Sequence, residues 1–275
     1  MKVIGVVAGN GKLPMMIYDY CQKNKIKCFF VFIDKIPEFN ISKEFYINCS
    51  IGKAGKLLSF FKKNKVTHIL LAGGVKKPNF STLKIDFKGF LLISKILKNR
   101  LLGDNILLSN VINYIEKHKF KVIATDELLP NMHLQEGINN KIKAYKSLDN
   151  DIKLGVEVIK NLSFFDIGQS LIIQNGRVIA LEAAEGTDEM IKRSKPYIEQ
   201  TNKHPALLVK LCKKNQDRRA DLPTIGIETI NNMYKSNIQI LVTDVNNSLV
   251  IDKKEFLSLA DKRNILIYGV IPDYE

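Results

Sequence analysis

The densest group of side chains that can do chemistry is a cluster of four charged residues near position 220. Asp217, Arg218, Arg219 and Asp221 lie within five residues of a polar stretch. Guanidinium groups bind phosphate oxygens as a fork, and carboxylates hold the divalent cation that neutralises a phosphoryl group. The cluster therefore predicts a catalytic site for phosphate and metal. A solvated loop with internal Asp–Arg ion pairs has the same composition, and the pattern alone leaves both interpretations open.

A second acidic cluster lies between residues 182 and 189, where a predicted strand gives way to a helix. Carboxylates at the end of a strand can hold a hard cation through oxygen, which makes Glu185 and Asp188 candidate metal ligands. Thr187, between them, is a candidate substrate contact. The alternative is local, because Thr187 can cap the helix while Asp188 and Glu189 favour its first turn. Capping leaves Glu182 and Glu185 unexplained.

Two glycine turns follow apolar, β-branched runs in the first half of the chain. Glycine allows a sharp turn, and the amides at the start of a following helix can then face a phosphate. Two such turns at strand carboxyl ends can flank one crevice of an open sheet. Ordinary tight turns, or a surface loop with solvated lysines, are the alternatives. The candidate phosphate contacts are Gly9, Gly11, Lys12, Gly73, Gly74 and Lys76.

The first half of the chain must position these turns, and its pattern is that of an α/β domain. Short apolar runs lie at 3–8, 28–33, 45–49, 67–72 and 121–124, and stretches of helical periodicity lie at 13–23, 52–64 and 105–117. Alternation of this kind predicts a largely parallel, doubly wound (Rossmann-like) sheet. We assign this domain to residues 1–140.

The second half has the pattern of an α+β domain with a mixed sheet. A Lys-rich linker at 141–150 precedes it, and the domain covers residues 151–275. Asn175-Gly176 between two apolar runs is a strong signal for a β-hairpin. Further strands are predicted at 206–211, 239–243, 248–251 and 266–270, with helices at 149–162, 187–195, 226–237 and 253–262. Strands and helices that do not alternate regularly are typical of the α+β class.

Composition narrows the range of partners. The chain carries 42 basic and 28 acidic residues, a formal net charge of +14. This surplus favours an anionic partner, such as a phosphorylated small molecule or an anionic lipid surface, unless the lysines are scattered over a solvated surface. Nucleic acid is not expected, because no basic platform with aromatic residues for stacking is recognisable. The four cysteines lack metal-binding spacing and predict reduced thiols in the cytosol.

A membrane partner would be met from the surface. No run approaches the ~18 consecutive apolar residues of a membrane-spanning helix. The segment 80–102 interleaves lysines with phenylalanine, leucine and isoleucine. It predicts either contact with an anionic membrane surface or a helix buried in the core, because its apolar residues are spread around the helix.

Five short motifs carry a family resemblance. They are AGNGKLP at 8–14, GGVKKP at 73–78, DIGQS at 166–170, AEGTD at 184–188 and RADLPTIG at 219–226. In this order and combination they resemble the metal-dependent, two-domain UDP-2,3-diacylglucosamine pyrophosphatases of lipid A biosynthesis. The resemblance extends from about residue 3 to residue 271.

This resemblance implies hydrolysis of UDP-2,3-diacylglucosamine to UMP and 2,3-diacylglucosamine 1-phosphate, with Mg²⁺ or Mn²⁺ as cofactor and a lipid site between the domains. Asp221, the aspartate of the last motif, is then the essential metal ligand, and Asp217, Glu185 and Asp188 are further candidates. Water is expected to attack the phosphorus next to the sugar. The expected location is the cytoplasm, peripheral at the cytoplasmic face of the inner membrane, with a homodimer left open. Substrate contacts in the second half are Thr187 and Thr224.

Two other classes of function remain. An NAD-type oxidoreductase is suggested by the α/β start with its glycine turn, and Asp34 stands at about the right distance for its acidic residue. The full G-x-G-x-x-G fingerprint is missing, however, because position 14 is proline. A non-catalytic binder of anionic membrane or nucleic acid is suggested by charge alone. Such a binder needs no carboxylates beside Arg218 and Arg219.

Overall fold

The computed structural model of the chain describes residues 2–33, 40–75, 85–90, 103–143, 145, 148–201, 203–214 and 216–273. It divides into two compact units. The first comprises Met1–Pro130 with Asp217–Asp221, and the second comprises Asn131–Gln216 with Leu222–Glu275. The chain enters the second unit before residue 140, the boundary assigned from the sequence, because the short strand β6 (Gly137–Ile138) already pairs with a strand of that unit.

The first unit is built on a five-stranded parallel sheet. Its strands are β1 (Ile4–Ala8), β2 (Cys28–Ile33), β3 (Tyr46–Cys49), β4 (His68–Ala72) and β5 (Lys121–Val122), in the order β3-β2-β1-β4-β5. Every residue of β2 is buried, as expected for a strand covered on both faces. The predicted Rossmann-like class is confirmed for this unit. The strand order reverses between β1 and β4, the kind of switch point at which open α/β sheets bind ligands.

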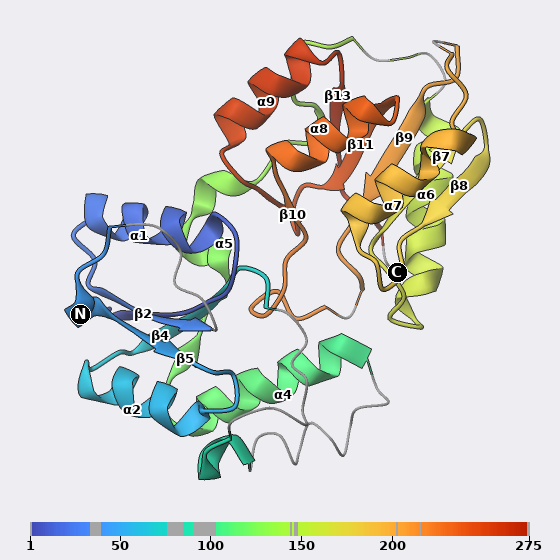
Figure 1. The fold of residues 1–275 in the computed structure, drawn as a ribbon. Helices are drawn as coiled ribbons and strands as arrows, with labels where there is room; N and C mark the ends of the chain where they lie inside the picture. Colours follow the sequence, from blue (N-terminus) through green and yellow to red (C-terminus); the bar gives the residue numbers. More distant parts are fainter. Residues whose placement is uncertain are drawn as a thin grey trace. The chain divides into compact units, whose positions relative to one another are not determined.

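Helices cover both faces of this sheet. They are α1 (Leu13–Lys23), α2 (Ala54–Lys63), α4 (Gly103–Lys117) and the short α5 (Thr125–Leu128), with a 3₁₀ turn, η1, at Lys43–Phe45. Figure 1 shows α1 on one face and α2 and α4 on the other. Alternate residues of β2, among them Phe29 and Val31, pack with Phe61 of α2 and Ile112 of α4.

The two glycine turns lie against each other at the switch point. Asn10 and Gly74 form an antiparallel bridge, in which Asn10 N lies 2.8 Å from Gly74 O and Gly74 N lies 3.0 Å from Asn10 O. A Cβ added at Gly9 would overlap the carbonyl of Gly74, and one added at Gly73 would overlap the carbonyl of Asn10. Gly73 also has φ +88°, a conformation that favours glycine. Close approach of two backbones therefore requires glycine at both positions.

The second unit is built on a six-stranded mixed sheet. Its strands are β6, β7 (Ser170–Gln174), β8 (Arg177–Leu181), β9 (Ala206–Lys210), β11 (Ile238–Asp244) and β13 (Leu266–Val270), in the order β6-β13-β11-β9-β7-β8. β11 pairs in parallel with β9 and β13, whereas the pairs of β13 with β6, β7 with β8 and β7 with β9 are antiparallel. The predicted mixed sheet and the Asn175-Gly176 hairpin are confirmed. A separate pair is formed by β10 (Thr224–Ile225) and β12 (Leu249–Val250).

Helices again cover both faces. They are α6 (Leu148–Ser163), α7 (Thr187–Ser194), α8 (Ile227–Lys235) and α9 (Lys253–Lys262), with 3₁₀ turns η2 (Pro130–Met132) and η3 (Lys195–Tyr197). One core lies between the sheet and α7, α8 and α9, with Met190, Ile230 and Phe256 fully buried. A second core, which contains Ile159 and Leu171, lies between the sheet and α6 (Figure 1). The two faces of the sheet are thus both apolar.

The five residues Asp217–Asp221 belong to the first unit, although the chain on both sides of them belongs to the second. Ala220 packs against the core of the first unit that contains Phe61 and Ile112. The sequence pattern placed this segment inside the second domain. The structure instead attaches the most chemically suggestive motif of the chain to the sheet that carries the glycine turns.

No helix in the described ranges has the length and apolar character needed to cross a bilayer. The segment 80–102, predicted to contact a membrane surface or to form a core helix, lies mostly outside the described residues. Asp34, considered for a dinucleotide site, lies outside them as well. All four cysteines are buried thiols that form no disulfide.

Gly73→Ala tests the contact between the glycine turns. It should lower the free energy of unfolding by about 2 kcal/mol or more, because it adds strain at a positive φ to an overlap with backbone. Gly74→Ala is the matched control, since a Cβ there meets open space, and it should change stability by less than about 0.5 kcal/mol. Urea unfolding measures both. Equal effects would contradict this account of the turns.

Candidate functional site

Ion pairs attach the charged cluster near position 220 to the first unit. The Arg219 guanidinium forms a fork with Asp217, with Nε–Oδ1 at 3.0 Å and Nη2–Oδ2 at 2.8 Å. Its Nη1 reaches Glu116 Oε1 of α4 at 3.0 Å. Arg218 forms an ion pair with Asp126 of α5. Both arginines predicted to bind phosphate therefore form ion pairs with carboxylates. Asp217 and Arg219 form the internal Asp–Arg pair that the sequence offered as the alternative to a phosphate site.

The fork also affects the protonation of Asp217 and the position of Asp221. Hydrogen bonds from Arg219 hold the pKa of the Asp217 carboxyl below its ordinary value, against the opposing effect of partial burial. The backbone N–H groups of Ala220 and Asp221 donate to the Asp217 carbonyl oxygen at 2.9 and 3.1 Å. This hydrogen-bonded turn presents Asp221 as an exposed residue.

The glycine turns supply backbone groups at the opening of α1. Gly11 has φ +101° and open space around its Cβ position, and Lys12, which is exposed, stands at the start of the helix. The first turn of α1 contains no acidic residue, so the positive end of the helix dipole is not neutralised there. Lys76, the other predicted cation, lies outside the described residues.

A buried polar network lies at one end of the mixed sheet in the second unit. Thr187 Oγ1 accepts a hydrogen bond from Lys210 Nζ at 2.7 Å, donates to Glu182 Oε2 at 3.1 Å, and lies 3.1 Å from Ser170 Oγ. Ser170 also donates to Glu182. Ser170, Lys210 and Glu182 are only 3, 5 and 8% exposed. The Lys210 ammonium and the Glu182 carboxylate are therefore held inside the fold. The Thr187 hydroxyl bridges them, and Ser170 is a second donor to the carboxylate.

This network explains residues that local patterns did not. Gly186, with φ +82°, occupies the cap position of α7, so Thr187 does not cap that helix and its hydroxyl serves the network instead. Burying a charged group costs several kcal/mol unless a partner compensates for the lost solvation. The role of Glu182 is to be that partner for the buried Lys210 ammonium, through Thr187. Lys210 and Ser170 were not predicted as functional. The available signal was a lysine inside the otherwise apolar run 206–212.

The three predicted metal ligands do not all come from one unit of the fold. Asp221 belongs to the first unit, and Glu185 and Asp188 belong to the second. Glu185 is held by Arg193, which lowers its pKa, and Asp188 Oδ1 accepts a hydrogen bond from Asn232 at 3.0 Å. Within the part of the chain that the structure describes, no three His, Cys, Asp or Glu residues form a metal-binding group.

The predicted contact Thr224 belongs to the separate strand pair of β10 and β12. Its residue is exposed in β10, and its hydroxyl donates to the backbone carbonyl oxygen of Leu222 at 3.0 Å. The hydroxyl of Thr224 therefore makes a local hydrogen bond within its own turn. Nothing in these contacts assigns it a ligand.

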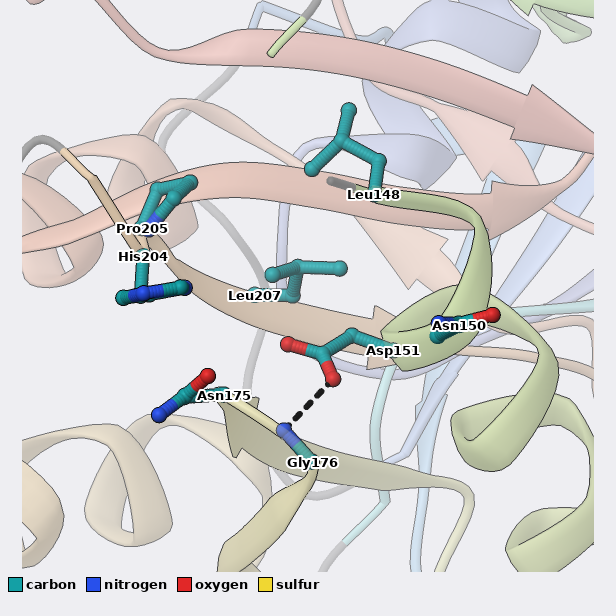
Figure 2. A pocket seen from close by; sticks show the side chains of 8 residues that line it. All are labelled: Leu148, Asn150, Asp151, Asn175, Gly176, His204, Pro205 and Leu207. Atoms are coloured by element: carbon teal, nitrogen blue, oxygen red, sulfur yellow. Dashed lines mark hydrogen bonds between the residues drawn. The ribbon is translucent and has the colours of Figure 1, made fainter. Parts of the chain in front are cut away.

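A cavity of about 250 Å³ in the second unit is lined by none of the predicted site residues (Figure 2). Asp151, His204 and Leu207 contribute to its wall, together with the hairpin turn at Asn175-Gly176. Asp151 is buried, and its Oδ1 accepts a hydrogen bond from Gly176 N at 2.7 Å (Figure 2). This carboxylate holds the hairpin turn against the start of α6, which is a structural role.

Arg219→Met tests the ion pairs that attach the charged cluster. It should lower the free energy of unfolding at neutral pH by about 1 kcal/mol, because the pair is partly solvated. Asp217 has a lower pKa in the folded chain, so its contribution is present above the unfolded pKa of about 3.9 and is lost as the pH falls through the folded value. The difference from wild type should therefore shrink between pH 6 and pH 3.

The control for this variant is Lys192→Met, which breaks an exposed pair with Glu189. It should change stability by less than about 0.5 kcal/mol at either pH. Urea unfolding at both pH values measures the two variants. A destabilisation by Arg219→Met that is equal at both pH values would contradict the role given to Asp217.

Comparisons with known proteins cover both units. The sequence profile of the LpxI N-terminal domain matches residues 3–132, and that of the LpxI C-terminal domain matches residues 135–268. UDP-2,3-diacylglucosamine pyrophosphatase LpxI of Caulobacter vibrioides is 27% identical over an alignment 276 residues long, and this alignment covers 99% of each chain. The two profiles meet within a few residues of the division between the compact units.

Comparison with a solved structure does not extend the family assignment. The adenylation, ketoreductase and pseudo Asub multidomain structure of a keto acid-selecting NRPS module gives a TM-score of 0.24 at 12% identity, and the match covers 99% of this chain but only 24% of that one. A likeness of this size carries no argument about fold or function. The two domain profiles, in contrast, account for nearly the whole length in the expected order, and the chain therefore belongs to the LpxI family.

Proposed function

We propose that this protein hydrolyses the pyrophosphate bond of UDP-2,3-diacylglucosamine, which yields UMP and 2,3-diacylglucosamine 1-phosphate for lipid A synthesis. The observation that carries the proposal is the full-length similarity to a UDP-2,3-diacylglucosamine pyrophosphatase, which covers 99% of both chains. The reaction needs charge neutralisation on two phosphates and a positioned water, and it needs no covalent nucleophile.

Asp221 is the residue that we propose to bind a divalent cation, Mg²⁺ or Mn²⁺. An exposed carboxylate on a hydrogen-bonded turn is an oxygen donor that hard cations accept. Asp217 and Glu185 each form an ion pair with an arginine, Arg219 and Arg193, which competes with the binding of a cation. The bound cation would neutralise charge on the phosphoryl oxygens. Asp217 and Arg219 are then positioning residues, which hold the turn that carries Asp221.

Two further groups fit the phosphates and the sugar of such a substrate. At the switch point, the N–H groups at the start of α1 and the side chain of Lys12 can face one phosphate. In the second unit, the Lys210 ammonium and the Thr187 hydroxyl offer donors held in fixed positions by burial. All the residues that form the start of α1 belong to the first unit, and all those that hold Lys210 and Thr187 belong to the second.

The acyl chains of this substrate place it in a lipid bilayer. We therefore propose that the protein acts peripherally at the cytoplasmic face of the inner membrane. Its net charge of +14 favours an anionic lipid surface, since each basic residue near such a surface adds attraction. Added salt should weaken this association because the attraction is screened.

Asp221→Ala tests the proposed metal ligand. Turnover should fall by at least about 100-fold, because removing the ligand removes charge stabilisation from the transition state. The melting temperature should stay within a few degrees of wild type, since an exposed side chain leaves no cavity. Mn²⁺ binding, followed by electron paramagnetic resonance, should weaken in parallel.

Asp19→Ala is the matched control for this variant, because it removes another exposed carboxylate of the first unit. It should leave turnover and Mn²⁺ binding unchanged. If Asp221→Ala kept near-normal turnover, or lost turnover while binding Mn²⁺ as tightly as wild type, Asp221 would not be the metal ligand.

Hydrolysis in ¹⁸O-labelled water tests which phosphorus is attacked. We expect water to attack the phosphorus next to the sugar, with UMP as the leaving group. The label should therefore enter 2,3-diacylglucosamine 1-phosphate, which mass spectrometry of the products detects. Label in UMP would mean that the opposite phosphorus is attacked and that the proposed course of the reaction is wrong.

A further inference from the structure

The turn between α6 and β7 exposes a cluster of apolar side chains. Phe164, Phe165 and Ile167 are 84, 68 and 46% exposed. Among the described residues, Phe164 is the most exposed large apolar side chain. The two rings contact each other edge to face, with centroids 5.3 Å apart. We name residues 164–167 the aromatic turn. Apolar groups gathered on a surface in this way mark an interaction site.

The aromatic turn is held in place by hydrogen bonds. Phe165 N donates to Leu162 O at 3.0 Å, and Asp166 N donates to Ser163 O at 3.2 Å. The buried Ser163 hydroxyl donates to Ile159 O at 2.7 Å, which secures the last turn of α6. The rings are therefore presented by ordered backbone, and their exposure does not come from a frayed helix end.

The single charged residue of the turn faces inward. Asp166 has φ +56° and forms an ion pair with Lys213, so that its side chain is only 19% exposed. Gly168, just beyond the turn, lies so close to the residue that follows β8 that an added Cβ would overlap the carbonyl of Glu182. Both contacts anchor the turn to the sheet and leave its apolar side chains on the outside.

The chain around the aromatic turn is basic. Residues 160–169 contain one lysine and one acidic residue, Asp166, while residues 209–216 contain three lysines and no acidic residue. Lys210 is buried in the polar network and Lys213 pairs with Asp166, whereas Lys214 is exposed and Lys160 is half-buried. Apolar rings beside lysines match a bilayer interface, where rings enter the headgroup region and ammonium groups meet anionic lipid.

The turn also lies at the end of the sheet that carries the polar network. Ser170, which begins β7 three residues after Ile167, pairs with Lys210 at the end of β9. Thr187 joins these two residues through its hydroxyl. A surface on which the aromatic turn sits would therefore lie near the buried ammonium and hydroxyls of the second unit.

We propose that the aromatic turn is a membrane-docking element, which inserts Phe164 and Phe165 into the interface of an anionic bilayer. The proposal rests on the proposed function for the reason that a bilayer is met at all, because the substrate is a diacylated lipid. Phenylalanine rings have no polar group that must be satisfied, so they can enter the interfacial region of a bilayer. The exposed Lys214 and the half-buried Lys160 add attraction to anionic headgroups.

Flotation of the full chain with lipid vesicles tests the docking element. Wild type should bind vesicles of phosphatidylcholine and phosphatidylglycerol, and Phe164→Ser with Phe165→Ser should reduce that binding about tenfold or more, because it removes most of the apolar surface that enters the interface. Tyr197→Ser is the matched control, since Tyr197 is 70% exposed in the same unit, and it should bind as wild type does. Melting temperatures should show that all variants are folded.

A second pair of phenylalanines provides the rival element. Phe87 and Phe90 of the first unit are 77 and 59% exposed, within the segment that the sequence suggested for membrane contact. Phe87→Ser with Phe90→Ser should keep at least half of the vesicle binding. Binding that is lost in this variant and retained in the Phe164 and Phe165 variant would overturn the proposal.

Two further readouts separate the proposal from its alternatives. Light scattering should give the same molar mass for wild type and the Phe164 and Phe165 variant. A lower mass for the variant would show that the turn joins copies of this chain, which would also overturn the proposal. Turnover of a short-chain, monomeric substrate should be unchanged by the substitution. If wild type bound vesicles through the turn but turned over no substrate, the proposed function would fail while the docking element stood.

Discussion

The fork between Arg219 and Asp217, extended to Glu116, is the interaction on which the arrangement of the candidate site depends. It joins α4 to a segment that follows it by about a hundred residues. The segment Asp217–Asp221 has only five residues and little apolar surface to bury. Charge-assisted hydrogen bonds and the packing of Ala220 must therefore hold it to the first unit. As a result Asp221 is carried by the sheet of the glycine turns, although its neighbours in sequence fold elsewhere.

The candidate groups for chemistry are consequently divided between the two units. The first holds Asp221 and the backbone groups of the glycine turns, where the strand order reverses. The second holds the buried network of Lys210, Thr187, Glu182 and Ser170. Each group is made rigid by its own surroundings. This suits a reaction in which the protein mainly orients a substrate and stabilises charge.

The regular elements were largely predictable because their signals are local. The bounds of α1, α9, β2 and β13 agree with the sequence prediction, since apolar periodicity, helix stop signals and glycine all act within a few residues. The strands β6 and β10 were missed because two residues give no period to detect. Tertiary pairing alone makes them strands.

The site was less predictable because its contacts are distant in sequence. The Asp–Arg pair was foreseen as an alternative, but Glu116 as its third member was not, since nothing local links α4 to residue 219. The reading of Thr187 as a helix cap was wrong because Gly186 takes that position at a positive φ. Lys210 fell inside the strand predicted at 206–211, and only the register with Ser170 gives it a role.

Our central proposal is that this chain catalyses metal-assisted hydrolysis of a nucleotide-linked lipid sugar. Its most direct test is UMP release from UDP-2,3-diacylglucosamine by the purified protein, first stripped with a chelator and then supplied with Mg²⁺ or Mn²⁺. The account predicts no release without a divalent cation, and equal amounts of UMP and 2,3-diacylglucosamine 1-phosphate once the cation is restored. Undiminished release in the chelator, or no release under either condition, would contradict it.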